Sequence, residues 1–202
     1  MFNKRAPYYL FMPVIFVILA FFYFNIQEQE RVSVIEVAFI TVKGSSNVNK
    51  WEMISNQASG SANMVFQNEK IRKINLLEVI LPSESFKSGN REMDANAYEA
   101  LNYTEYPYIT FRLSEVLSLT HQADSTLLSV SGILNVAGQS RTIQFDAIGR
   151  TKKSRLFFQG STSFNMTDFN ITPPIAMNGT YVTDDQVTVT FDVTYKVLTE
   201  PI

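Results

Sequence analysis

The chain has 202 residues, enough for a short targeting or anchoring segment and one domain with its own core. Its 17 basic and 19 acidic residues leave a formal net charge of −2 without a long run of either sign, so no nucleic-acid partner is expected. The absence of cysteine excludes disulfides, thiolate nucleophiles, cysteine metal sites and a lipid attached through an N-terminal cysteine.

The N-terminal part predicts a membrane anchor. Residues 6–24 read APYYLFMPVIFVILAFFYF, 19 residues without a charge, which as a helix would span roughly 28 Å of a hydrocarbon core about 30 Å thick. Lys4 and Arg5 precede this segment, whereas the polar run 27–30 follows it. The positive-inside rule therefore places the N-terminus in the cytoplasm and the rest of the chain outside.

This interpretation divides the chain into residues 1–30, comprising a cytoplasmic stub, a transmembrane helix and a short linker, and residues 31–202, comprising one domain. A cleaved signal peptide is the main alternative, although its apolar part is normally shorter and ends in small residues, unlike the aromatic exit at 21–24. A buried core helix is a third alternative, which the length of the apolar run disfavours.

After Arg31 the apolar residues recur with period two, which is typical of strands with one buried face. The clearest case is 187–197, where Val, Phe and Tyr alternate with Thr, Asp and Lys. Short polar connections at 137–140 and 152–154 predict hairpins and therefore antiparallel neighbours. The pattern predicts an all-β domain, either a sandwich or a barrel, with eight strands near residues 32–43, 57–66, 73–81, 108–120, 127–136, 141–151, 155–165 and 185–197.

Two short helical insertions are predicted among the strands. Asp94 is a candidate N-cap for a helix over 95–101, with Met93 and Tyr98 placed as a hydrophobic staple. A weaker start, resembling a capping box, lies at 49–52, around the only tryptophan.

Residues that carry catalysis are scarce. The single histidine, His121, lies in a polar context that favours a solvated hairpin residue over a base or metal ligand. The pair Asp184 and Asp185 is the nearest approach to a cation site, but its surroundings are rich in turn residues. We therefore assign no catalytic residue, no metal site and no cofactor.

The apolar interior is the remaining candidate site. An eight-stranded barrel is just wide enough either to fill with side chains or to enclose one small ligand. Small residues recur among the large apolar ones, at Gly60, Ala62, Gly132, Gly149 and Gly160, and would leave volume if they face inward. Because strand glycines also mark bulges and barrel corners, the pattern leaves a ligand cavity and a filled core equally open.

Specific segments resemble the YceI-like family of bacterial lipid-binding barrels. The resemblance covers residues 32–197. In chain order, its motifs are Thr41–Asn47 with Trp51-Glu52, Pro82-Ser83 with Lys87-Ser88-Gly89 and Met93-Asp94, Tyr98–Leu101 with Tyr106–Phe111, Gly132–Gly138 with Arg141, and Met166–Pro174.

This resemblance implies an extended lipocalin-like barrel, exported to the periplasm, that holds a long polyisoprenoid or fatty-acid-derived chain without catalysis. The chain departs from the family where many relatives have a His-Asp-Trp run, since it has Asn49-Lys50-Trp51. The uncleaved anchor is a second departure. It predicts a single-pass protein of the inner membrane whose barrel mouth lies within about one linker of the bilayer.

Inward apolar side chains and a helical flap would then form the binding site. The predicted lipid-binding residues are Trp51, Tyr98, Leu101, Phe111, Leu113, Leu134, Phe145, Phe164, Phe169, Val189 and Phe191. An envelope scaffold with a filled barrel is the alternative function, an enzyme acting on a bound lipid is a weaker third, and homodimerisation is left open.

Overall fold

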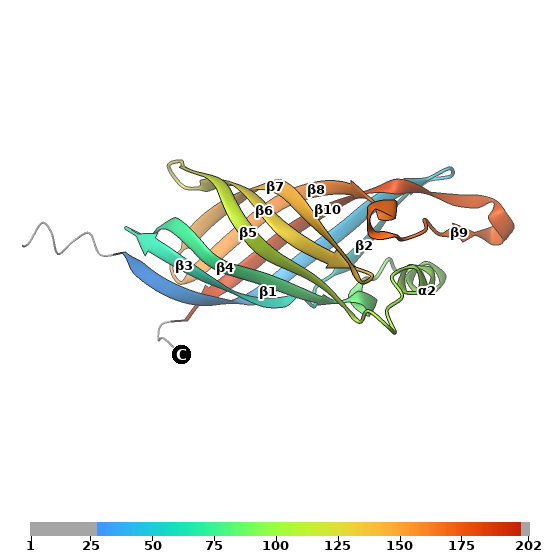
Figure 1. Ribbon diagram of the computed structural model, residues 1–202, viewed down its shortest axis with the longest axis horizontal. Coiled ribbons are helices and arrows are strands. Elements are labelled where there is room, and N and C mark those ends of the chain that lie inside the picture. The colour runs from blue at the N-terminus through green and yellow to red at the C-terminus, as the bar shows by residue number, and fades with distance from the viewer. Residues whose placement is uncertain (1–27, 199–202) are drawn as a thin grey trace, which may run out of the picture.

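All eight segments with alternating character form strands in the computed structural model, which describes residues 28–198 (Figure 1). Two further strands, β2 and β9, were not predicted. The strands are β1 (Gln29–Ser46), β2 (Lys50–Ser55), β3 (Ser59–Gln67), β4 (Lys70–Pro82), β5 (Tyr108–His121), β6 (Thr126–Val136), β7 (Gln139–Lys152), β8 (Arg155–Asn165), β9 (Ile175–Ala176) and β10 (Tyr181–Val197).

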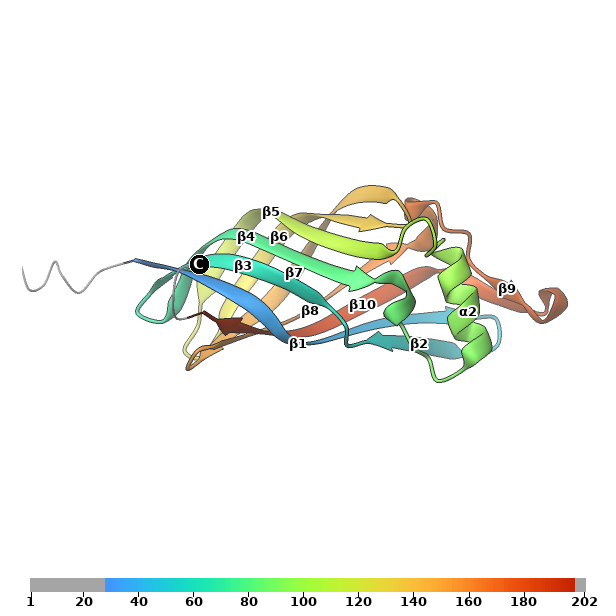
Figure 2. The ribbon, with the colours of Figure 1, turned by 90° about the horizontal axis from the view of Figure 1, so that it is seen from below.

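Pairing between the first and last long strands closes the sheet into a barrel (Figure 2). The order is β1-β3-β4-β5-β6-β7-β8-β10, and β10 pairs with β1 from Ser33↔Val197 to Ser46↔Thr183. On its other edge β1 serves two partners, β3 along residues 29–34 and β2 along residues 40–45. Because β2 and β3 share one position in the barrel wall and β9 pairs only with β10, the ten strands form a barrel with eight strand positions. The predicted eight-stranded antiparallel barrel is confirmed.

The two predicted hairpins are also confirmed. Ala137 and Gly138 join β6 to β7 with positive φ angles of 48° and 74°, the pattern of a type I′ turn, whose twist matches that of the flanking strands. Lys153, with φ of 56°, turns the chain from β7 into β8.

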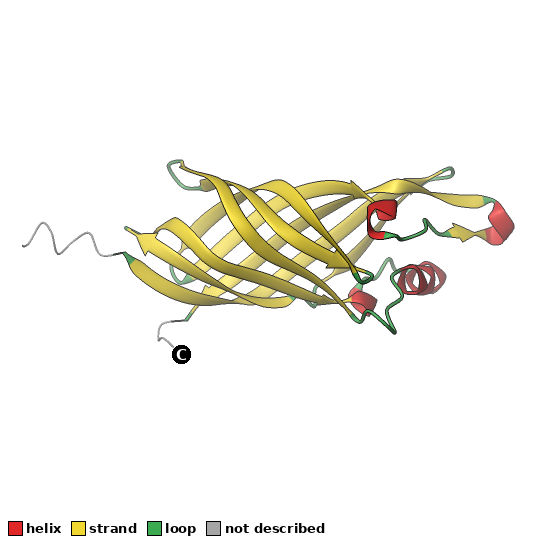
Figure 3. Cartoon of the chain, in the orientation of Figure 1, coloured by secondary structure: helices red, strands yellow, loops and turns green. Residues whose placement is uncertain are grey.

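Within residues 28–198, helical structure consists of one α-helix and three short 3₁₀ turns, drawn in red in Figure 3. They are η2 (Ser83–Ser85), α2 (Arg91–Ala100), η3 (Met166–Phe169) and η4 (Met177–Gly179). The N-cap of α2 is Asn90, whose side-chain oxygen accepts hydrogen bonds from the amides of Glu92 and Met93.

The predicted cap at Asp94 is therefore wrong by one helical turn. Its carboxylate instead accepts hydrogen bonds from the amide and the hydroxyl of Ser88, both at 2.7 Å. With the cap at Asn90, Met93 falls inside the helix, so the predicted hydrophobic staple is absent as well.

The helical start predicted at 49–52 is wrong, because this segment opens β2. Trp51 pairs with Gly44 of β1, and its ring fills the space where a β-carbon of Gly44 would lie. The ring nitrogen donates to the carbonyl of Ser45 at 3.1 Å. Pairing with β1 thus overrode the local capping signal.

None of the helices within residues 28–198 combines the length and apolarity needed to cross a bilayer. The predicted anchor, residues 6–24, lies outside the described residues.

Candidate functional site

An apolar cavity of about 720 Å³ occupies the interior of the barrel. Its wall is made by inward side chains from most of the long strands, with α2 and the β9–η4 segment at one end. A volume of this size falls within the ~300–1,000 Å³ of typical small-molecule pockets. The barrel is therefore not filled by its own side chains.

Nine of the eleven residues predicted for the site line this cavity. They are Trp51, Leu101, Phe111, Leu113, Leu134, Phe145, Phe164, Val189 and Phe191. Val189 and Phe191 lie on the apolar side of a strand that alternates cleanly, so period-two reasoning was sufficient to place them. Leu134 was placed in the same way on β6, although Leu127 and Ile133 interrupt the polar face of that strand. Contact of these residues with a ligand stays a prediction.

Tyr98 and Phe169 do not line the cavity. The hydroxyl of Tyr98 donates to the carbonyl of Phe86 at 2.6 Å and accepts from Lys87, and this bond raises the pKa of Lys87. Phe169 is fully buried against Phe164, with ring centroids 5.0 Å apart. Tyr98 therefore ties α2 to the segment before it, and Phe169 supports a wall residue from behind.

Three phenylalanines form an aromatic belt across the barrel wall. Phe111 on β5, Phe145 on β7 and Phe191 on β10 have successive ring centroids 5.4 Å apart. The strands between them contribute Gly132 on β6 and Gly160 on β8. A β-carbon at these glycines would lie 2.3 Å from the ring of Phe111 and 2.4 Å from that of Phe191.

The belt corrects the expected role of the glycines. Gly132 and Gly160 do not leave open volume themselves, because aromatic rings occupy the space beside them. Because these two glycines have no side chain, the rings pack against the barrel wall and do not project across the lumen. Gly60 serves a role that was not predicted, since its missing β-carbon permits the close approach of the Glu78 carbonyl oxygen.

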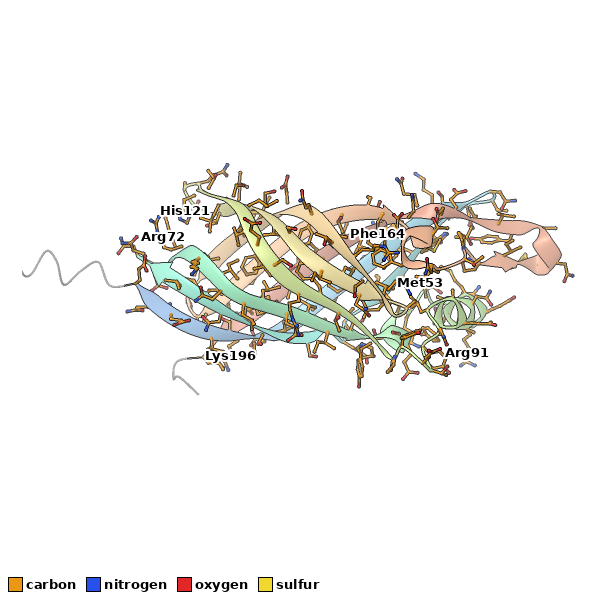
Figure 4. The ribbon with its side chains drawn as sticks, viewed as in Figure 1. Met53, Arg72, Arg91, His121, Phe164 and Lys196 are labelled. Atoms are coloured by element: carbon orange, nitrogen blue, oxygen red, sulfur yellow. The ribbon has the colours of Figure 1, made fainter. Side chains whose placement is uncertain are left out.

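One end of the barrel is closed by packed side chains. Phe66 pairs with Ile71 beside the β3–β4 turn, and Leu156 follows the β7–β8 turn; all three are fully buried and lie outside the cavity lining. His121 lies at this same end, as Figure 4 shows. The apolar plug blocks access from this side.

The opposite end forms the mouth, between α2 and the β9–η4 segment. The only charged residues of the cavity lining, Lys50, Glu52 and Glu92, come from β2 and α2 at this end. A ligand with an apolar chain and a polar end would meet a mainly apolar wall along its length and charged groups only at the mouth.

The mouth and the start of β1 lie at opposite ends of the barrel (Figures 1 and 2). Gln29 opens β1 at the closed end, and the chain crosses the barrel's length before it reaches the β1–β2 turn. The expectation of a mouth within about one linker of the anchoring bilayer does not fit this geometry.

Candidate residues for catalysis or metal binding are engaged elsewhere. His121 ends β5 and lies 3.1 Å from the hydroxyl of Thr126; it is half-buried, less solvated than predicted. Asp184 and Asp185 lie in β10, not in a turn, and accept hydrogen bonds from Ser45 and Thr167. No cluster of three His, Asp or Glu suited to a metal occurs in residues 28–198.

Some lining residues escaped sequence analysis. Ala176, Met177 and Tyr181 belong to an extension in which β9 pairs with the first residues of β10, a region where no alternation was recognised. On β4, register shifts opposite β3 blur the period, so Leu77 and Val79 were not singled out.

This barrel has counterparts in known proteins. The model of the YceI-like domain matches residues 27–195. The chain belongs to the YceI-like family. No curated protein matches it.

Solved structures share the YceI-like fold at low sequence identity. BcnA of Burkholderia cenocepacia has a TM-score of 0.64 at 16% identity, covering 78% of this chain and 95% of BcnA. A polyisoprenoid binding domain from Saccharophagus degradans, implicated in plant cell wall breakdown, has a TM-score of 0.63 at 14% identity, covering 83% and 98%. A Campylobacter jejuni YceI protein has a TM-score of 0.55 at 16% identity, covering 71% and 82%.

Proposed function

We propose that this YceI-like protein binds one long apolar lipid, such as a polyisoprenoid or a fatty-acid derivative, inside its barrel and carries or stores it without chemical change. The observation that carries the proposal is the apolar cavity of about 720 Å³ with a closed end and a mouth. Polyisoprenoid binding by the Saccharophagus degradans domain supports the same ligand class.

The physical basis is burial of the chain. Each methylene moved from water into an apolar site contributes about 0.8 kcal/mol, so a chain of ten or more carbons binds tightly without a charged anchor. The aromatic belt and Leu134 provide walls on which such a chain packs. A scaffold function for a filled barrel is disfavoured by the cavity itself.

The setting that we propose is the periplasmic face of the inner membrane, with residues 6–24 as the anchor. Anchoring would retain the lipid carrier at one membrane.

The first test is to extract the native membrane-bound protein with organic solvent and analyse the extract for lipid. Native mass spectrometry of the full chain then measures uptake of added polyprenol. Absence of both co-purified lipid and uptake would contradict the proposal.

A pair of variants on β6 sharpens this test. Leu134 faces the cavity, whereas its neighbour Ile133 faces outward and is exposed. Leu134→Trp should displace about two methylenes of ligand and weaken binding about tenfold. Ile133→Trp adds the same ring outside the barrel and should leave binding unchanged. Equal effects of the two changes would place the lipid elsewhere.

A further inference from the structure

A group of exposed apolar side chains surrounds the mouth of the barrel. We call Val48, Ile175, Met177 and Val182 the rim cluster; their exposed fractions are 67%, 62%, 69% and 41%. Val48 lies in the β1–β2 turn, and the other three belong to the β9–η4–β10 extension at the right of Figure 1. Exposed apolar residues scattered singly are common, but a group of them on one edge marks a surface that contacts a membrane or a partner.

The two hairpins that carry the rim cluster are joined by hydrogen bonds. The amide of Asn47 donates to the Val182 carbonyl at 3.1 Å, and the side-chain oxygen of Asn47 accepts from the Val182 amide at 2.9 Å. The Asn47 side chain also donates to the Thr180 carbonyl, and the Tyr181 hydroxyl donates to Asn49 at 3.0 Å. The rim is thus one connected structure that holds its apolar residues in place.

The rim cluster is continuous with the cavity. Ile175 and Val182 are cross-strand partners, while the residues that alternate with them, Ala176 and Tyr181, line the cavity. Met177 does both, since it lines the cavity and is also the most exposed large apolar residue of the described chain. An apolar path therefore runs from the lumen, over Met177, to the outside of the rim.

The rim carries no charge. Residues 44–49 and 170–183 contain no Lys, Arg, Asp or Glu. Attraction to anionic lipids or to a charged protein face needs clustered charge of the opposite sign. Contact through this rim would therefore depend on apolar burial and not on electrostatics.

We propose that the rim cluster docks on the surface of a lipid bilayer, inserting its apolar side chains among the headgroups so that lipid passes between the bilayer and the cavity. A bilayer fits better than a protein partner, because the rim is a narrow projecting edge, whereas a stable protein interface buries ~800 Å² per partner. The exchange step rests on the proposed function, but the docking itself does not.

Because the mouth lies opposite the start of β1, the docked bilayer is a different membrane surface from one that holds the N-terminal end. The geometry suits transfer between two membranes.

The test uses the full chain in nanodiscs of phosphatidylcholine, mixed with large phosphatidylcholine vesicles. Co-sedimentation measures docking, and transfer of a fluorescent polyprenol measures exchange. In the double variant Val48→Asp/Ile175→Asp, which changes two rim-cluster residues outside the cavity lining, both should fall by at least about tenfold, because two charges replace apolar side chains. Leu117→Asp, which changes an exposed apolar residue of β5, is the matched control and should have no effect.

Docking of the wild type should persist when salt is raised from about 0.1 to 0.5 M, where charge attraction is screened. Co-sedimentation that requires anionic lipid, or an unchanged double variant, would overturn the inference. Failure of the wild type to take up polyprenol from detergent, with docking intact, would instead contradict the proposed function alone. Equal polyprenol uptake by wild type and double variant in detergent would confirm that the double variant folds.

Discussion

The ring of Phe191 on β10 lies against Gly160 on β8, at a point where a β-carbon on the glycine would be 2.4 Å from the ring. The carbonyl oxygen of Asp146 would lie 2.7 Å from the same β-carbon. Side chain and backbone therefore both require glycine at this position. The aromatic belt and the cavity beside it depend on this fit.

Gly160→Ala should destabilise the protein by about 1–3 kcal/mol, because the added methyl overpacks the wall and pushes the ring into the lumen. Urea denaturation measures the loss. In a Phe191→Leu background the ring is absent, so the same change should cost less. A Gly160→Ala protein as stable as the wild type would contradict this prediction, because it would show that the barrel wall accommodates the added methyl without losing free energy of unfolding.

Asp94→Ala should loosen the attachment of α2 at the mouth. The buried carboxylate accepts both hydrogen bonds from Ser88, and its loss leaves a backbone amide without a partner, at a cost of about 1–3 kcal/mol. Thermal unfolding measures this cost, and we expect faster release of bound lipid. Glu92→Ala, on the same helix but outside this hydrogen-bond pair, is the control and should change stability by less than about 0.5 kcal/mol.

Tyr195→Phe should stabilise the protein by about 1 kcal/mol. The Tyr195 hydroxyl is buried without a hydrogen-bond partner among the described residues, and burial raises its pKa. Removing an unsatisfied hydroxyl removes its desolvation cost, while the ring keeps its contact with Phe158. Tyr181→Phe breaks a hydrogen bond to Asn49 and should not stabilise. Loss of stability in Tyr195→Phe would mean that the hydroxyl has a partner.

Stability should fall between about pH 7 and 5 because of His121. Burial, with Lys70 and Arg72 nearby, lowers the pKa of His121 in the folded chain. As the pH falls through about 6.5, the unfolded chain therefore binds a proton before the folded chain does, and the free energy of unfolding decreases. Urea denaturation across this range should show the slope in the wild type and a flatter one in His121→Gln. Identical slopes would exclude the histidine as its source.

The sequence by itself determined the eight long strands of the barrel, and the faces of those that alternate cleanly. In β10, Val187 to Val197 alternate with polar residues, and because successive side chains of a strand point to opposite faces, the inner wall was predictable from order alone. The turn at Ala137 and Gly138 was predictable for the same reason, since its chemistry is local. So were the wall positions of Phe111, Leu134 and Phe191, although their contact with lipid stays a prediction.

Only the tertiary structure decided how the barrel closes, which end opens and what the glycines do. Closure depends on pairing of Ser33 with Val197, residues at opposite ends of the domain, whose register no local pattern encodes. Trp51 lies in a strand because its segment pairs with β1. The ring of Phe191 packs against Gly160 because β10 and β8 are neighbours in the sheet. Phe66 and Leu156 come from separate hairpins and close one end of the barrel only when the folded chain brings those hairpins together. Gln29 lies at that closed end, so the mouth is at the opposite end.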